Sequence, residues 1–125
     1  MAKPPAPTPR KPIEFRGNAL DDLKAFPEGT RREAGFQLDQ VQQGRDPDDW
    51  KPMNTVGAGV REIRIKDADG AFRVMYVAKF EEAIFVLHCF QKKTQKTGRL
   101  DLTTGEERYK ALVKELKELR KERKP

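Results

Sequence analysis

The stretch that decides the fold is residues 60–97, VREIRIKDADGAFRVMYVAKFEEAIFVLHCFQKKTQKT. Its runs at about 60–66, 71–79 and 83–91 are rich in β-branched and aromatic residues, which favours strands. The turn at 67–70 carries the Asp and Gly that tight turns need, and Glu81-Glu82 marks a second, short acidic turn. The stretch therefore predicts three consecutive antiparallel strands.

The two turns also predict the pairing of these strands. With 67–70 as the first loop, Ile65 faces Phe72 and Arg64 faces Arg73; with Glu81-Glu82 as the second, Met75 faces His88, Tyr76 faces Leu87 and Ala78 faces Phe85. Side chains alternate between the faces of a strand. One face is then apolar and suited to packed helices: Ile63, Ile65, Phe72, Val74, Tyr76, Ala78, Phe85, Leu87 and Cys89. The other is mixed, and we expect it to be uncovered: Glu62, Arg64, Arg73, Met75, Val77, Val86, His88, Phe90 and Lys92.

The residues before this stretch predict a tail, a strand and two helices. Residues 1–12 are rich in proline and basic residues, which predicts a disordered tail before a single domain at 13–125. Residues 13–16 alternate apolar and polar side chains, as an edge strand does. Asn18 is placed to cap a first helix with Asp21 in capping-box position, and Pro27 to begin a second that ends at Gly44. We expect this helical hairpin to cover the apolar face.

Two further segments complete the predicted architecture. Residues 45–59 have the composition of a long loop, in which Trp50 is either a packing anchor or an exposed base-stacking residue. Thr104 and Glu107 have the spacing of a capping box, which predicts a C-terminal helix from Thr104 to about residue 122. The whole is an α+β arrangement: a small antiparallel sheet with a helical hairpin on one face and a C-terminal helix.

Composition narrows the class of protein. The 125 residues suffice for one domain, and a net charge of +6 with a pI near 9.5 favours a nucleic-acid, acidic-lipid or acidic-protein partner, although a merely solvated basic surface remains an alternative. Cys89 is the only cysteine, which excludes an internal disulfide and a multi-Cys zinc site. The sequence has neither a run of about 20 apolar residues nor the apolar core of a signal peptide, so we expect a cytoplasmic protein without membrane contact.

The candidate site is a group of basic residues around one histidine. The sequence has no Walker loop, dinucleotide fingerprint, zinc spacing or nucleophile elbow, so no cofactor or metal is expected. Metal-free RNA cleavage needs a proton acceptor for the 2′-hydroxyl, a proton donor for the leaving 5′-oxygen, and cations for the phosphoryl charge. His88 with Arg64, Arg73 and Lys92 would meet these needs, whereas a lone strand histidine is more often a packing residue.

Several motifs resemble the phage-derived, HigB-like branch of the RelE/ParE toxin superfamily. The similarity covers about residues 12–113, and the motifs that carry it are 61–64, 72–76, 87–97, 26–28 and 46–52. The resemblance implies a RelE-like fold and the toxin of a type II toxin–antitoxin pair. Relatives of RelE and HigB are mRNA endonucleases that act on ribosome-bound message, whereas relatives of ParE poison DNA gyrase. The implied partner is an antitoxin, typically with a helix-turn-helix domain, and the complex would bind operator DNA.

The resemblance also assigns roles to individual residues. Arg73 matches the catalytic arginine of the endonucleases, and Arg61, Arg64, Lys92 and Lys93 fall where these enzymes carry basic residues. Tyr109 is too far along the chain to match their terminal tyrosine, so His88 becomes the candidate general acid or base. We expect catalysis by Arg73, His88, Arg64 and Lys92, and RNA binding by Arg61, Lys93, Lys96 and Arg99. A gyrase poison or an inactive basic nucleic-acid-binding module are the alternatives.

Overall fold

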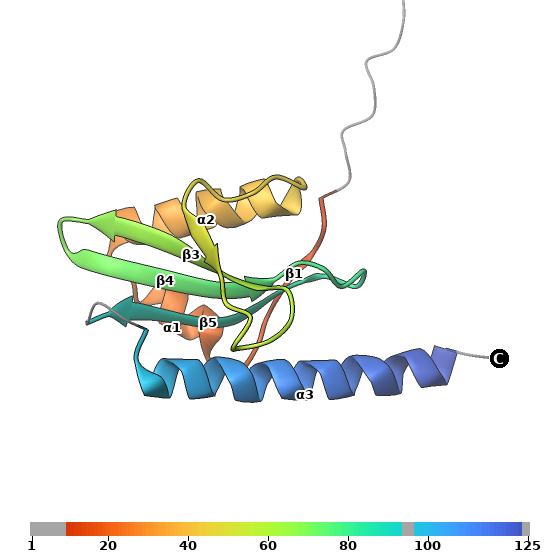
Figure 1. Cartoon of the computed structure of the whole chain (residues 1–125). Helices are drawn as coiled ribbons and strands as arrows, with labels where there is room; N and C mark the ends of the chain where they lie inside the picture. Colours follow the sequence, from red (N-terminus) through yellow and green to blue (C-terminus); the bar gives the residue numbers. More distant parts are fainter. Residues whose placement is uncertain (1–9, 94–96, 124–125) are drawn as a thin grey trace, which may run out of the picture.

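The computed structural model describes residues 10–93 and 97–123, and it shows an α+β protein built around a five-stranded sheet (Figure 1). The predicted tail at residues 1–9 and the predicted RNA-binding residue Lys96 lie outside the described residues. In chain order the elements are β1 (Ile13–Phe15), α1 (Ala19–Lys24), α2 (Glu28–Gln42), β2 (Trp50–Pro52), β3 (Val60–Asp67), β4 (Gly70–Val77), β5 (Ile84–Lys92) and α3 (Arg99–Arg123).

The sheet is mixed, with strand order β1-β5-β4-β3-β2, so the prediction of a purely antiparallel sheet is wrong at β1. β1 runs parallel to β5, with Ile13 opposite Ile84, and the backbone N–H of Ile84 donates to the carbonyl of Pro12 at 2.8 Å. A parallel pair requires a long connection. The connection between β1 and β5 contains α1, α2, β2, β3 and β4. Because the two strands are so far apart in the sequence, local sequence signals cannot show that they pair.

The segment predicted as the loop 45–59 contains β2, which pairs with β3 at the other edge of the sheet. Its three residues include Pro52, and proline is tolerated only at an edge strand or a bulge. So short a strand with a proline has no recognisable alternation, which explains why the sequence pattern failed to indicate it.

The predicted pairing of β3 with β4 is confirmed, with Arg64 opposite Arg73 and Ile65 opposite Phe72. Between β4 and β5 the prediction holds only as far as Met75 opposite His88. A bulge then shifts the register, so that Tyr76 lies opposite Val86 rather than Leu87 and Val77 lies opposite Phe85. One extra residue in a strand changes the face of those that follow.

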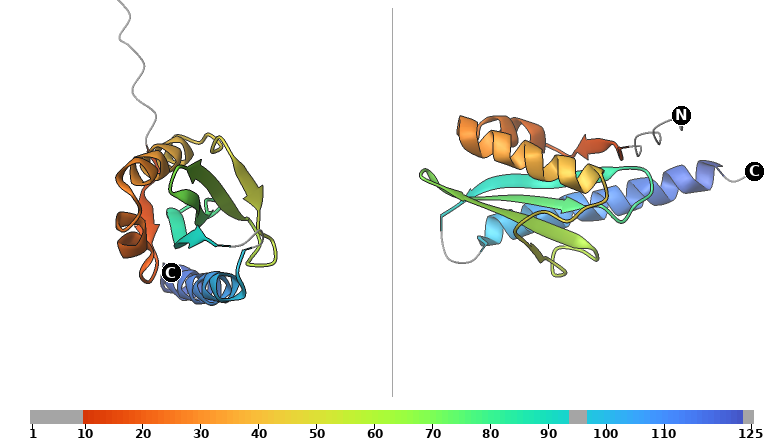
Figure 2. Two further views of the ribbon diagram at one scale, coloured as in Figure 1. Left: turned by 90° about the vertical axis from the view of Figure 1, so that its left-hand side faces the viewer. Right: turned by 90° about the horizontal axis from the view of Figure 1, so that it is seen from above.

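Two apolar clusters lie on the two faces of the sheet, and helices cover both (Figure 2). α1 and α2 pack on one face, as predicted, and Val86 joins them because of the bulge. α3 packs on the other through Leu112 and Leu116, together with Phe85 and Leu87, so the prediction that Phe85 and Leu87 lie under the helical hairpin is wrong. The expectation of an uncovered face is therefore wrong, because α3 buries Met75 and its neighbours on that side.

The helix ends differ from the predicted caps. α3 begins at Arg99 rather than Thr104, and Thr104 lies inside the helix. Asn18 precedes α1, but its side chain makes no capping hydrogen bond; its carbonyl accepts from Asp22 instead. Gly44 follows α2 with a φ of +84°, as expected for a helix end. No helix in the described part of the chain is long and apolar enough to cross a membrane.

Candidate functional site

Four basic side chains from four adjacent strands lie on the α3 side of the sheet, and we call them the cationic row: Lys51, Arg64, Arg73 and Lys92. Their common side follows from the register, because Lys51 pairs with Glu62, Arg64 with Arg73, and Lys92 with Ala71. Burial lowers the pKa of Lys92, and the charges of Arg73, Lys51 and Arg64 lower it further, against a raising effect of Glu62. Like charges therefore converge here, and this arrangement suits a polyanion.

A buried ion pair lies within the row. Glu62 is 0 % exposed and Arg73 is 2 % exposed, and the Arg73 Nε lies 3.4 Å from the Glu62 Oε1. The Thr97 hydroxyl donates to the Glu62 Oε2 at 3.1 Å, and the Arg73 Nη1 donates to the Phe72 carbonyl at 2.9 Å. Burial lowers the pKa of Arg73, and the Glu62 charge partly restores it. Arg73 is thus held by Glu62 and the Phe72 carbonyl, and it lies opposite the exposed Arg64 on the neighbouring strand.

The sequence patterns did not assign a role to Glu62 or Thr97. One signal pointed to Glu62: it is an acid on the strand face that also carries Arg64 and Arg73. Nothing local to Thr97 indicated that its hydroxyl would reach across the fold to β3.

His88 lies on the same face as Arg73 but is covered by the first turn of α3. Its Nε2 is 2.7 Å from the Asp101 Oδ1, and its ring stacks on Phe90 with centroids 4.9 Å apart. Phe90 pairs with Arg73, so this aromatic ring lies between the imidazole and the guanidinium along the sheet. His88 is 9 % exposed, and its Nδ1 has no hydrogen-bond partner among the residues described. Asp101 therefore orients the imidazole, a contact that the sequence did not predict.

The remaining predicted residues are divided between the two faces. Arg61 lies on the α2 side, opposite Tyr76, because it alternates with Glu62 and Arg64 along β3. The guanidinium carbon of Arg61 lies 4.0 Å from the centroid of the Trp50 ring, so Trp50 packs against Arg61. Lys93 is exposed just after β5, and Arg99 is exposed at the start of α3. The structure thus groups Arg64, Arg73 and Lys92, adds Lys51, and places Arg61 elsewhere.

The chemistry of this site follows from the side chains present. The cationic row supplies guanidinium and ammonium groups for phosphate oxygens, and His88, which is hydrogen-bonded to Asp101, supplies an imidazole on the same face of the sheet. No cluster of three or more His, Cys, Asp or Glu residues that could hold a metal ion occurs within residues 10–93 and 97–123.

The sheet with its two N-terminal helices and C-terminal helix is broadly consistent with a RelE-like fold. The family model described as "Phage derived protein Gp49-like (DUF891)" matches residues 21–110. The chain therefore belongs to the Gp49-like family, which is a RelE/ParE-like toxin family. A search of curated proteins finds no match.

Proposed function

We propose that this chain is the toxin of a type II toxin–antitoxin pair, of the HigB-like branch, and that it cleaves ribosome-bound mRNA without a metal ion. Membership of the Gp49-like family supports the toxin assignment. The cationic row carries the assignment to RNA, because it gathers like charges from four adjacent strands beside a histidine that is hydrogen-bonded to a carboxylate. The partners in this proposal are a helix-turn-helix antitoxin, the ribosome with its message, and operator DNA bound by the toxin–antitoxin complex.

In the proposed reaction the 2′-oxygen of a nucleotide attacks the adjacent phosphorus, and the bond to the 5′-oxygen of the next nucleotide breaks. The products are a 2′,3′-cyclic phosphate and a 5′-hydroxyl. Arg64 and Lys92 bind the phosphoryl oxygens, and Arg73, held by Glu62, adds charge behind them. The 2′-hydroxyl loses a proton and the 5′-oxygen gains one; His88, whose ring Asp101 holds, makes one of these two transfers and water makes the other.

The RNA strand extends beyond the scissile phosphate in this proposal. Lys93 and Arg99, which are exposed on either side of the 94–96 segment, bind its backbone, together with Lys96 of that segment. Affinity should then fall steeply with salt, since counterions are released from the backbone on binding.

The test is growth arrest on induced expression in a bacterial host, with cleavage sites mapped on ribosome-bound mRNA. Arg64→Ala with Lys92→Ala removes two of the three accessible charges of the row and leaves Lys51, and we expect loss of arrest and of cleavage with the fold intact. Arg31→Ala removes an exposed charge on α2 and is the matched control. If the double variant cleaves message at the normal rate, the site assignment is wrong.

Arg73 and His88 need a different design because both are nearly buried. Arg73→Lys keeps the charge but loses the planar guanidinium, and His88→Asn keeps a smaller polar amide that cannot act as an acid or base; the melting temperature of each shows whether the fold survives. Folded variants without cleavage activity support a role in the reaction, and folded variants with full activity exclude it.

A gyrase poison is distinguished by which synthesis stops first. Early loss of labelled leucine incorporation with continued thymidine incorporation supports the endonuclease, whereas early DNA-damage signalling refutes it. Salt-sensitive binding to any polyanion without arrest would indicate a plain nucleic-acid-binding module and would also refute the proposal.

A further inference from the structure

A second basic hollow lies on the opposite face of the sheet from the cationic row. Its volume is about 530 Å³, and we call it the Tyr76 pocket; its walls are the end of α2, the strands β3 and β4, and the segment before β1. The charged lining residues are four basic and one acidic: Lys11, Arg45, Arg61, Lys79 and Asp46. The endonuclease activity proposed above does not use this pocket.

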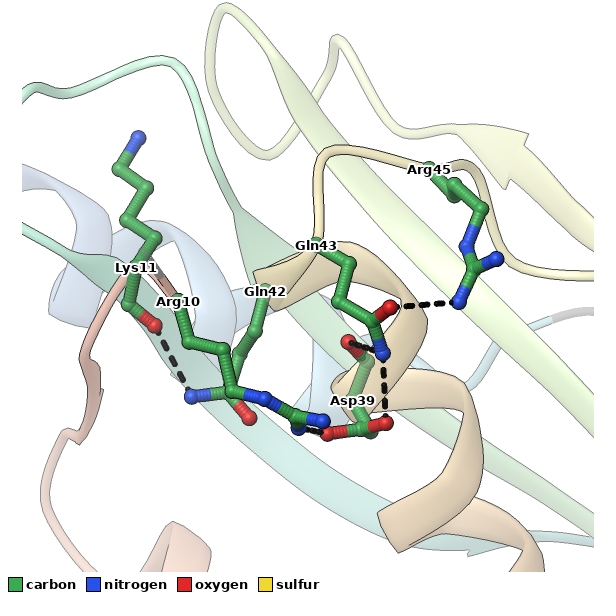
Figure 3. Close-up of polar contacts among 6 residues, drawn as sticks. All are labelled: Arg10, Lys11, Asp39, Gln42, Gln43 and Arg45. Atoms are coloured by element: carbon green, nitrogen blue, oxygen red, sulfur yellow. Dashed lines mark hydrogen bonds and ion pairs between the residues drawn. The ribbon is translucent and has the colours of Figure 1, made fainter. Parts of the chain in front are cut away.

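The α2 wall of the pocket is held in place by polar contacts (Figure 3). The Gln42 amide donates to the Lys11 carbonyl at 2.9 Å, which ties the segment before β1 to the helix end. The Arg45 guanidinium donates to the Gln43 amide oxygen at 2.8 Å, so a neutral group rather than an acid fixes it. No acidic side chain is therefore needed to hold Arg45 in this position at the rim.

Tyr76 provides the observation that points to a ligand. The residue is 1 % exposed and lines the pocket, and its hydroxyl has no well-aligned hydrogen-bond partner among residues 10–93 and 97–123, although the Arg61 guanidinium lies close enough to interact with it. Buried polar atoms in folded proteins are almost always paired. Burial raises the pKa of this hydroxyl and the nearby Arg61 guanidinium opposes that rise, so the hydroxyl is a neutral donor beside a cation.

Arg61 is pre-oriented next to this hydroxyl. Its guanidinium carbon lies 4.0 Å from the centroid of the Trp50 ring, and its Nη1 donates to the Asp46 Oδ1 at 2.7 Å. A guanidinium has five N–H donors in a fixed plane, so one bond to Asp46 leaves donors for a second anion. Lys11 and Lys79 add less, because the Lys11 ammonium bonds to the Ala78 carbonyl and the Lys79 ammonium lies over the Phe80 ring.

We propose that the Tyr76 pocket binds a phosphate ester, with the Arg61 guanidinium and the Tyr76 hydroxyl donating to its oxygens and Arg45 supplying charge at the rim. A phosphate has enough acceptor oxygens for these three donors at once. The volume lies within the range of small-molecule sites, so the pocket has room for more than the bare ion. The phosphate can belong to a free mononucleotide or to the phosphorylated end of an RNA strand.

The test is binding of inorganic phosphate and of adenosine monophosphate to the full chain, followed by backbone amide NMR shifts and by thermal stabilisation. We expect shifts around residues 43–46, 61 and 76. Arg61→Ala should weaken binding by roughly tenfold or more and Tyr76→Phe by a few-fold, as for lost hydrogen bonds to a charged ligand. Arg31→Ala, an exposed cation on α2 far along the sequence from the pocket residues, is the matched control and should leave the affinity unchanged.

The two sources of phosphate are separated by comparing adenosine monophosphate with a short RNA carrying a 5′-phosphate and with the same RNA carrying a 5′-hydroxyl. Tyr76→Phe also tests a purely structural role, since it then changes the melting temperature equally with and without phosphate. Phosphate shifts confined to the cationic row, or equal affinity in Arg61→Ala and the unmodified chain, would overturn the proposal. Both readouts are independent of toxicity, so this pocket and the proposed endonuclease activity stand or fall separately.

Discussion

The buried pair of Glu62 and Arg73 makes the most demanding prediction, because removing one partner leaves the other charge inside the fold. At 3.4 Å and an effective dielectric constant of about 20, their mutual attraction is about 5 kcal/mol. Desolvation of both charges offsets much of this, so the intact pair adds little net stability. Arg73→Ala, however, leaves the 0 % exposed Glu62 carboxylate with only the Thr97 hydroxyl, and we expect a loss of about 3–5 kcal/mol.

The assay is urea unfolding of a double-mutant cycle. We expect Arg73→Ala and Glu62→Ala each to lower the free energy of unfolding strongly, with a melting temperature lower by about 12–20 °C, at about 4 °C per kcal/mol. Arg73→Met with Glu62→Leu should recover most of this loss, because no buried charge remains. Arg64→Ala, whose side chain is 39 % exposed in the same row, is the control and should change stability by about 0.5 kcal/mol or less. If Arg73→Ala costs less than about 1 kcal/mol, or the apolar pair recovers nothing, the reasoning is refuted.

Three further predictions concern titration, reactivity and packing. The pKa of Lys92 is lower in the folded chain than in the unfolded chain, so protonated Lys92 lowers the free energy of unfolding. This loss of stability is complete below the folded-state pKa and fades as pH rises from there toward the unfolded-state pKa. NMR titration should find a Lys92 pKa below the ordinary value, and this pKa should rise when RNA is added. Burial raises the pKa of the Cys89 thiol to about 12, so we expect thiol reagents to modify it only at the rate of unfolding, and fast native labelling would contradict this. Leu112→Ala on α3 should cost about 2–5 kcal/mol in urea unfolding, whereas Leu119→Ala, at a position 39 % exposed, should cost less than about 1 kcal/mol.

The strand pairing shows where sequence patterns suffice and where they fail. The turn at 67–70 has strong local chemistry, and it fixed the pairing of Arg64 with Arg73 correctly. The bulge near Leu87 has no local signature in the sequence; it lies where β5 also pairs with β1 and where Leu87 packs in the α3 cluster. The predicted pairing of β4 with β5 is therefore wrong where contacts with other elements, rather than the turn, accompany the change of register.

The helix ends and the site show the same limit. The Thr104–Glu107 spacing resembled a cap, yet α3 starts at Arg99, directly after Gly98, whose carbonyl accepts from the backbone N–H of Leu102. Alternation placed Arg64, Arg73 and Lys92 on one face, and they do share it. It could not show that Asp101 of α3 would cover His88, since that contact depends on how a distant helix docks.

The parallel pairing of β1 with β5 constrains the order of events when the chain is made. At roughly 5–20 residues per second, residues 84–86 are synthesised roughly 4–14 s after residues 13–15. Throughout that interval β1 has no strand beside it, and afterwards the edge of β5 stays open until β1 docks. The earliest-synthesised strand is thus among the last to be placed, and a fusion or truncation that delays Ile13–Phe15 should leave the sheet complete on one side and prone to self-association on the other.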